Sequence, residues 1–177
     1  MFKRRNNISN IILSQHKGEF SKILVLVDGS QPSINAADRA IALAKKEKDN
    51  PQLLIALHVV FSRVGYAYSP EGVFGMDGLT TPNAMKEILE NAKKEAQQWF
   101  DNIKEKINMD NNNIQLQPDV VVTATSIVSA IVEYAKNKDV DLIVIGTRGR
   151  SGFKKLLLGS VASGVVTNAA CPVMVVK

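Results

Sequence analysis

Residues 22–30 read KILVLVDGS, and this stretch decides the fold. Lys22 to Asp28 is apolar at almost every position, which is typical of a parallel strand buried on both faces. Gly29 then allows a tight turn. Ser30 fits the cap of a following helix, and Pro32 fits its first turn. The stretch therefore predicts a strand, a turn and a helix, which together begin an α/β unit.

The same alternation continues to the end of the chain. Apolar residues recur at helical spacing from Ile34 to Ala44, from Met85 to Ile107, from Ile127 to Ala135 and from Val161 to Ala169. Four more apolar segments predict strands at 53–60, 114–123, 141–146 and 172–176. Five strands separated by helices indicate a parallel sheet with right-handed crossovers. An eight-stranded barrel needs about 250 residues, so we predict an α/β fold with an open, doubly wound five-stranded parallel sheet.

Composition supports a single globular domain. The chain has 177 residues, of which 45% are hydrophobic and 22% charged, enough to bury a real core. Cys171 is the only cysteine, which predicts a reducing, cytoplasmic setting. No apolar run approaches the roughly 18 residues of a membrane span. The apolar run at 11–13 is too short for a signal-peptide core, so we do not expect secretion.

The net charge of +5 is concentrated at the N-terminus. Four basic residues and one acidic residue give residues 1–20 a charge of +3, which leaves +2 for the rest of the chain. We therefore expect a basic N-terminal extension at 1–20 and one domain at 21–177. A basic tail on a nearly neutral domain argues against nucleic acid or a membrane as the main partner.

Candidate ligand-binding residues follow two of the predicted strands. Open α/β sheets bind ligands beyond the carboxyl ends of their strands. Asp28 comes after the first strand, and a glycine-rich loop begins at Gly146. Ser160 is expected near the start of the last helix, where its hydroxyl would cap that helix or contact a phosphate. Glycines and a helix N-terminus together offer backbone N–H groups to phosphates.

Other catalytic fingerprints are missing from the sequence. It contains no P-loop motif, no GxGxxG after the first strand and no GxSxG elbow. The two histidines are isolated, and His58 lies inside an apolar strand, so we predict that it is a core histidine. No set of protein ligands demands a metal.

The glycine spacing is the family signal. Gly146-x2-Gly149-x9-Gly159-Ser160 matches the G-x2-G-x9-G-[ST] motif of ATP-binding universal stress proteins. The flanking segments KILVLVDGS, ALHVV, VDLIVIGTRGR, LLLGSVASGVV and CPVMVVK agree with that family in the same order. From Ser21 to Lys177 the chain therefore resembles a universal stress protein.

This resemblance implies a sheet of strand order 3-2-1-4-5, of the adenine-nucleotide alpha-hydrolase-like type. It also implies a homodimer paired through the strand Pro172 to Val176. Asp28 is expected near the adenosine, and Val59 is expected to contact the adenine through its backbone. The ribose and phosphates are assigned to Gly146, Arg148, Gly149, Gly159, Ser160 and Val161. Four neighbours complete the expected site: Gly29, Ser30, Thr147 and Arg150.

The expected function is that of an ATP-binding, nucleotide-responsive regulator with at most slow hydrolysis, with Mg²⁺ or Mn²⁺ accompanying the ATP and an unknown protein as partner. Two alternatives stay open. One is a true ATPase or phosphotransferase that uses Asp28. The other is a dimeric scaffold that needs no nucleotide. The segment Ser62 to Pro82 is too long for an ordinary connection, and loops of this length are usually either functional or disordered. Two alternatives stay open for it: the loop closes over the nucleotide, or it is self-packed or mobile. Residues 123–126 read TATS, where many members of the family have Gly-x-Pro.

Overall fold

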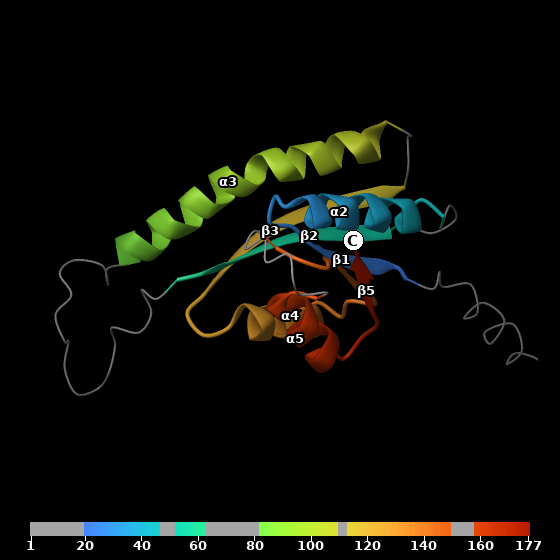
Figure 1. Ribbon diagram of the computed structural model, residues 1–177. Coiled ribbons are helices and arrows are strands. Elements are labelled where there is room, and N and C mark those ends of the chain that lie inside the picture. The colour runs from blue at the N-terminus through green and yellow to red at the C-terminus, as the bar shows by residue number, and fades with distance from the viewer. Residues whose placement is uncertain (1–19, 47–51, 63–81, 110–112, 150–157) are drawn as a thin grey trace, which may run out of the picture.

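A computed structural model describes residues 20–46, 52–62, 82–109, 113–149 and 158–177. It shows one twisted sheet between two layers of helices (Figure 1). The strands are β1 (Lys22–Leu26), β2 (Gln52–Phe61), β3 (Ile114–Thr123), β4 (Leu142–Gly146) and β5 (Val173–Val176). The helices are α2 (Gln31–Ala44), α3 (Pro82–Asn108), α4 (Ile127–Asn137) and α5 (Ser160–Asn168).

The five strands are all parallel, and their order across the sheet is β3-β2-β1-β4-β5. The predicted fold class and strand order are therefore confirmed. β1 is central and pairs with β2 on one side and with β4 on the other. Because both of its faces are covered by helices, β1 is apolar along nearly its whole length.

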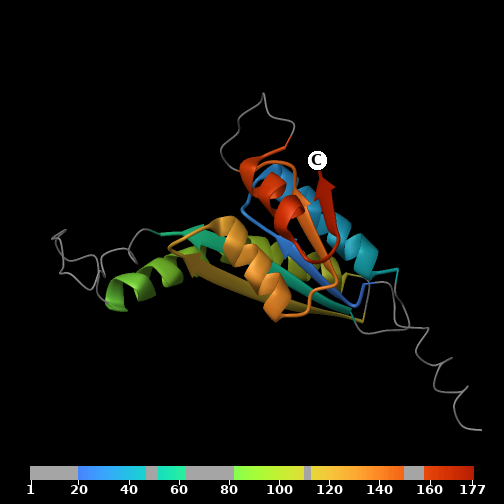
Figure 2. The ribbon, with the colours of Figure 1, turned by 90° about the horizontal axis from the view of Figure 1, so that it is seen from below.

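Side chains alternate along β1 between two separate cores. Ile23 and Val25 pack beneath α2 and α3, while Leu24 and Leu26 pack beneath α4 and α5. The underside of the sheet in Figure 2 carries α4 and α5, which lie side by side. The helices on the two faces are thus held by the period-two alternation of the strands.

The strand ends differ slightly from the expected bounds. β1 ends at Leu26, so Val27 and Asp28 belong to the turn that leads into α2. Pro172 has no N–H to donate to a sheet, and β5 begins one residue later at Val173. The turn at 123–126 leads from β3 into α4 although it lacks the Gly-x-Pro of many family members. Its last residue, Ser126, caps α4 by accepting a hydrogen bond from the backbone N–H of Ser129 at 3.3 Å.

Some predictions fall outside the described residues. These are the extension before residue 20, the loop at 63–81 and Arg150. Within the described part of the chain, no helix combines the length and the apolar character that crossing a membrane requires.

Candidate functional site

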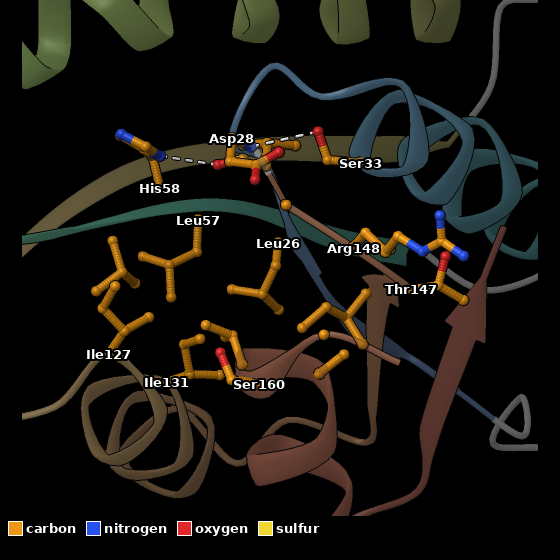
Figure 3. Close-up of a pocket in the computed structure, with 18 residues that line it drawn as sticks. Leu26, Asp28, Ser33, Leu57, His58, Ile127, Ile131, Thr147, Arg148 and Ser160 are labelled. Atoms are coloured by element: carbon orange, nitrogen blue, oxygen red, sulfur yellow. Dashed lines mark hydrogen bonds between the residues drawn. The ribbon is translucent and has the colours of Figure 1, made fainter. Parts of the chain in front are cut away.

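A cavity of about 230 Å³ opens at the carboxyl ends of β1, β2 and β4, between the sheet and the layer of α4 and α5 (Figure 3). Its position follows from the topology. α2, the helix after β1, covers one face of the sheet, while α5, the helix after β4, covers the other face. The chain therefore leaves the two neighbouring strands in opposite directions, which opens a crevice between them.

The inner part of the cavity is apolar. Leu26 and Leu57 point down from the sheet, and Ile127 and Ile131 point up from α4 (Figure 3). Ile145 and Ala162 complete this wall. These branched side chains leave a slot whose size suits a compact heterocycle, and they offer no hydrogen bonds to it. Flat apolar ring systems gain most from burial in such a slot.

Asp28 lies at the rim of the slot, in a fixed orientation. Its Oδ1 accepts hydrogen bonds from the backbone N–H of Ser30 at 3.0 Å and from the Ser30 hydroxyl at 2.6 Å. The hydroxyl of Ser33 accepts a further hydrogen bond from the backbone N–H of Asp28 at 3.3 Å. Asp28 itself does not cap α2, because Ser30 occupies the N-cap position.

The glycine-rich loop packs tightly against this carboxylate. A Cβ added at Gly149 would lie 2.7 Å from Asp28 Oδ2, which is closer than real Cβ atoms come to another heavy atom. The backbone N–H of Gly159 donates to the carbonyl of Thr147 at 2.7 Å, and the N–H of Thr147 donates to the carbonyl of Val176 at 2.7 Å. The two glycine turns are thus joined to each other and to the end of β5.

The N-terminus of α5 faces the cavity without a side-chain cap. α2 and α4 are capped by the hydroxyls of Ser30 and Ser126, but α5 begins after Gly159, which has no side chain to offer. Ser160 is the first residue of the helix, and its hydroxyl makes no cap hydrogen bond within the described structure. The first N–H groups of a helix have no intrahelical acceptor and carry its positive dipole end. An anion at the mouth of the cavity would satisfy them.

His58 is a buried structural residue. It is 5% exposed, and its Nδ1–H donates to the carbonyl of Val27 at 2.8 Å. Its ring also packs edge-on against Trp99, with ring centroids 5.1 Å apart. The predicted core role of His58 is therefore confirmed. The next residue, Val59, lines the cavity.

The structure brings together most of the residues that the sequence predicted for the site. Those lining the cavity are Asp28, Val59, Gly146, Thr147, Arg148, Gly149, Gly159, Ser160 and Val161. Gly29 instead faces Trp99 on the other side of the sheet. Ser30 does not line the cavity, but it donates hydrogen bonds to the carboxylate of Asp28. The sequence reasoning missed Ile127 and Ile131 because nothing local distinguishes cavity-lining residues from core residues on the apolar stripe of α4.

Arg148 does not direct its charge into the slot. Its guanidinium points away from the space between Leu26 and Ser160 (Figure 3). Its Nε is buried and has no hydrogen-bond partner among the described residues. A buried, unpaired donor on a charged group is costly, so a bound anion within its reach would be stabilising.

The titratable residues of this region do not form a metal site. Within the described ranges, no three His, Cys, Asp or Glu side chains gather closely enough to hold a metal ion. The cavity therefore combines an apolar slot, one oriented carboxylate and a rim of backbone N–H groups. That combination suits a ligand with a flat ring at one end and an anionic group at the other.

The fold and the cavity define an open parallel α/β domain of the class that binds small ligands at a switch in strand order. The model of the universal stress protein family matches residues 19–177. The chain belongs to this family.

Known relatives agree with this assignment. The universal stress protein MJ0531 of Methanocaldococcus jannaschii is 32% identical over 170 residues, which cover 96% of this chain and 89% of that protein. The solved structure of MJ0577, from the same organism, has a TM-score of 0.69 and 25% identity, covering 90% of this chain and 96% of that one. A universal stress protein solved in complex with cAMP has a TM-score of 0.50 and 25% identity, covering 89% of this chain and 97% of that one.

Proposed function

We propose that this universal stress protein binds an adenine nucleotide, with ATP as its ligand, and acts as a nucleotide-responsive regulator. The observation that carries the proposal is the meeting, in one cavity, of an apolar slot, the oriented carboxylate of Asp28 and the uncapped N-terminus of α5. A relative crystallised with cAMP supports an adenine nucleotide as the class of ligand.

In this proposal the adenine occupies the apolar slot between Leu57 and Ile131. Val59 would meet the edge of the base through its backbone, and Asp28 would accept hydrogen bonds from the adenosine. Carboxylate oxygens are acceptors only, so Asp28 would select donor groups such as hydroxyls or an exocyclic amine. Ser30 would keep that carboxylate in place through the two hydrogen bonds it donates.

The phosphates would leave the slot toward the two glycine turns. Gly149 lets the backbone approach, and the N–H groups of Ser160 and Val161 at the start of α5 would donate hydrogen bonds to the phosphate oxygens. The hydroxyl of Ser160 is not used as a cap and would donate to a phosphate oxygen. ATP would bring a divalent cation, Mg²⁺ or Mn²⁺, bound mainly by its own phosphates.

Regulation suits the site better than rapid turnover. Phosphoryl transfer needs a positioned nucleophile as well as a bound nucleotide. Among the described residues, His58 is committed to Val27, and Asp28 Oδ1 accepts two hydrogen bonds from Ser30. Any hydrolysis is therefore expected to be slow, and steady turnover abolished by D28A with binding retained would favour the ATPase alternative instead.

The assembly we propose is a cytoplasmic homodimer joined along β5. This strand is at the end of the sheet order, and all four of its residues are half-buried in the single chain. An apolar edge strand is a pairing site unless it is covered. Pairing of two β5 strands about a twofold axis would cover both edges.

The proposal is tested on nucleotide that copurifies with the full chain. Denaturing the purified protein should release ATP or ADP, identified by mass spectrometry, and adding Mg-ATP to nucleotide-free protein should raise its Tm. S160A and D28A should each reduce that shift, whereas S126A, which changes the cap of the neighbouring helix, should leave it intact. Protein that carries no nucleotide and shows no thermal shift with Mg-ATP would contradict the proposal and favour the scaffold alternative.

A further inference from the structure

β3 forms one edge of the sheet, and among the described residues no strand lies beyond it (Figure 2). Its hydrogen bonds to β2 show how its backbone is oriented. The N–H of Gln52 donates to the carbonyl of Asn113 at 3.0 Å, and the N–H of Ser62 donates to the carbonyl of Thr123 at 2.8 Å. Because backbone groups alternate between the two sides of a strand, the odd-numbered residues of β3 face β2. The even-numbered residues direct their backbone groups outward, and these are Ile114, Leu116, Pro118, Val120 and Val122.

Pro118 interrupts the outward row of backbone groups. Such a row is a template for pairing with another strand, and β3 is ten residues long, which is ample for a strand of ordinary length. Pro118 is exposed and has no N–H to donate. The missing N–H falls on the side of β3 that faces away from β2, which is where an edge strand tolerates proline.

The next outward position, Val120, is interrupted in a different way. Its N–H is already paired, because Asp119 Oδ1 accepts a hydrogen bond from it at 2.8 Å. The carboxylate of Asp119 therefore lies over the open edge, in the place that a carbonyl of an added strand would take. Its negative charge also repels the carbonyl oxygens of such a strand.

Tyr134 of α4 holds Asp119 in this position. The hydroxyl of Tyr134 donates to Asp119 Oδ2 at 2.8 Å, so each oxygen of the carboxylate has a donor. Burial and the neighbouring carboxylate raise the pKa of Tyr134, which keeps its hydroxyl protonated and able to donate at neutral pH. Hydrogen bonds at both oxygens fix the carboxylate over the edge.

The two interruptions together leave no room for a strand of ordinary length. Between Leu116 and Val122, which are six positions apart, about 20 Å of edge offers no free N–H at roughly 3.3 Å per residue. Every run of five residues within β3 contains Pro118 or Val120, and strands are usually about 5–6 residues long. A carbonyl of the added strand that is buried without a donor destabilises the pair. The opposite edge strand, β5, reads VMVV and has neither a proline nor a charged residue.

We infer that Pro118, together with the pair formed by Asp119 and Tyr134, closes the β3 edge to strand pairing with a second copy of the chain. Asp119 acts by occupying the N–H of Val120, and Tyr134 is a positioning residue that acts through Asp119. None of these residues lines the proposed nucleotide cavity, and the test contains no nucleotide. Failure of either proposal therefore leaves the other standing.

The variant P118V/D119A of the full chain should open the edge, because it restores an outward N–H at position 118 and frees that of Val120. Light scattering after size-exclusion chromatography should show a mass that rises with concentration to about twice that of the unaltered chain or more. Q115V is the matched control, since it adds the same side chain to β3 at a residue whose backbone faces β2. E133A removes a negative charge next to Tyr134 in the sequence, and both controls should keep the mass of the unaltered chain.

Amide hydrogen exchange measured by NMR tests the closed edge without the double variant. The N–H of Val120 should exchange about tenfold more slowly in the unaltered chain than in D119A. D119N should keep the slow exchange, because asparagine still offers an oxygen to that N–H. Y134F should give an intermediate rate, because it removes only the group that orients the carboxylate.

The inference is supported if P118V/D119A associates while circular dichroism shows it folded, and if Val120 exchanges faster in D119A. It is overturned if the folded double variant keeps the mass of the unaltered chain, or if Q115V associates as strongly. Equal exchange of Val120 in the unaltered chain and in D119A would also overturn it, and an unchanged rate in Y134F would overturn the positioning role of Tyr134.

Discussion

Replacing Gly149 by alanine should weaken nucleotide binding while leaving the fold intact. The added Cβ would lie 2.7 Å from Asp28 Oδ2, whereas ordinary contacts begin at 3.4 Å. The carboxylate must therefore move by the difference, about 0.7 Å, against its hydrogen bonds from Ser30 at 3.0 and 2.6 Å. Hydrogen bonds to charged groups are worth about 1.5–3 kcal/mol. Distorting them should cost roughly 1–2 kcal/mol of ATP binding, or about a 5- to 30-fold rise in Kd.

Gly146 provides the contrast for this prediction. A Cβ there would also approach to 2.7 Å, but the atom it meets is the backbone carbon of Pro32 in α2. Backbone cannot move aside as a carboxylate can, so G146A should lower the free energy of unfolding by about 1–3 kcal/mol. Urea unfolding measures the stability of both variants, and titration calorimetry measures their ATP affinity.

A double-mutant cycle tests the cause. Because G149A acts by displacing Asp28, adding it to D28A should cost little further affinity. The reasoning is refuted if G149A binds ATP as tightly as the unaltered chain, if it loses as much stability as G146A, or if its effect on affinity is undiminished in the D28A background.

Three further predictions concern single side chains. S160A should change the free energy of unfolding by less than about 0.5 kcal/mol, because its hydroxyl is not a cap, whereas S126A should lose about 1 kcal/mol of stability in urea unfolding; equal losses would contradict the capping assignment. H58F should destabilise the chain by about 1–3 kcal/mol, since the buried carbonyl of Val27 loses its donor; an unchanged urea midpoint would argue against that bond. Burial raises the pKa of the Cys171 thiol, so less of it is thiolate near pH 8 than in an unfolded chain. Iodoacetamide should therefore alkylate folded protein more slowly than unfolded protein at that pH, and equal rates would contradict this.

The strands and the glycine turns were predictable because their signals are local. KILVLVD is apolar on both faces, and that pattern alone requires helices on both sides of β1. The spacing of Gly146, Gly149 and Gly159 places two tight turns at the carboxyl edge of the sheet. These features depend on backbone conformation and burial, which a short stretch of sequence determines.

The direction of side chains around the site was less predictable. Gly29 and Ser30 are adjacent to Asp28, yet one faces Trp99 and the other supports the carboxylate from behind. The sequence predicts Ser160 near the N-cap, whereas in the structure Gly159 is the N-cap and Ser160 is the first residue of the helix, so its hydroxyl is not used for capping. Which way a turn residue faces depends on how α3 crosses the sheet, and that is a tertiary contact.

The apolar half of the cavity illustrates the same limit. Ile127 and Ile131 follow the helical spacing of ordinary core residues, and only the crossing of α4 over the end of β2 makes them part of a slot. The sequence contains no local sign of this arrangement.

Titration calorimetry of ATP and GTP against the nucleotide-free full chain is the most direct test of the central claim. The account predicts saturable binding of ATP at one site per chain. GTP should bind about tenfold more weakly, because the polar edge of guanine would lie unpaired against the apolar slot. Absence of heat with ATP, or equal affinity for GTP, would contradict the assignment of this cavity to an adenine nucleotide.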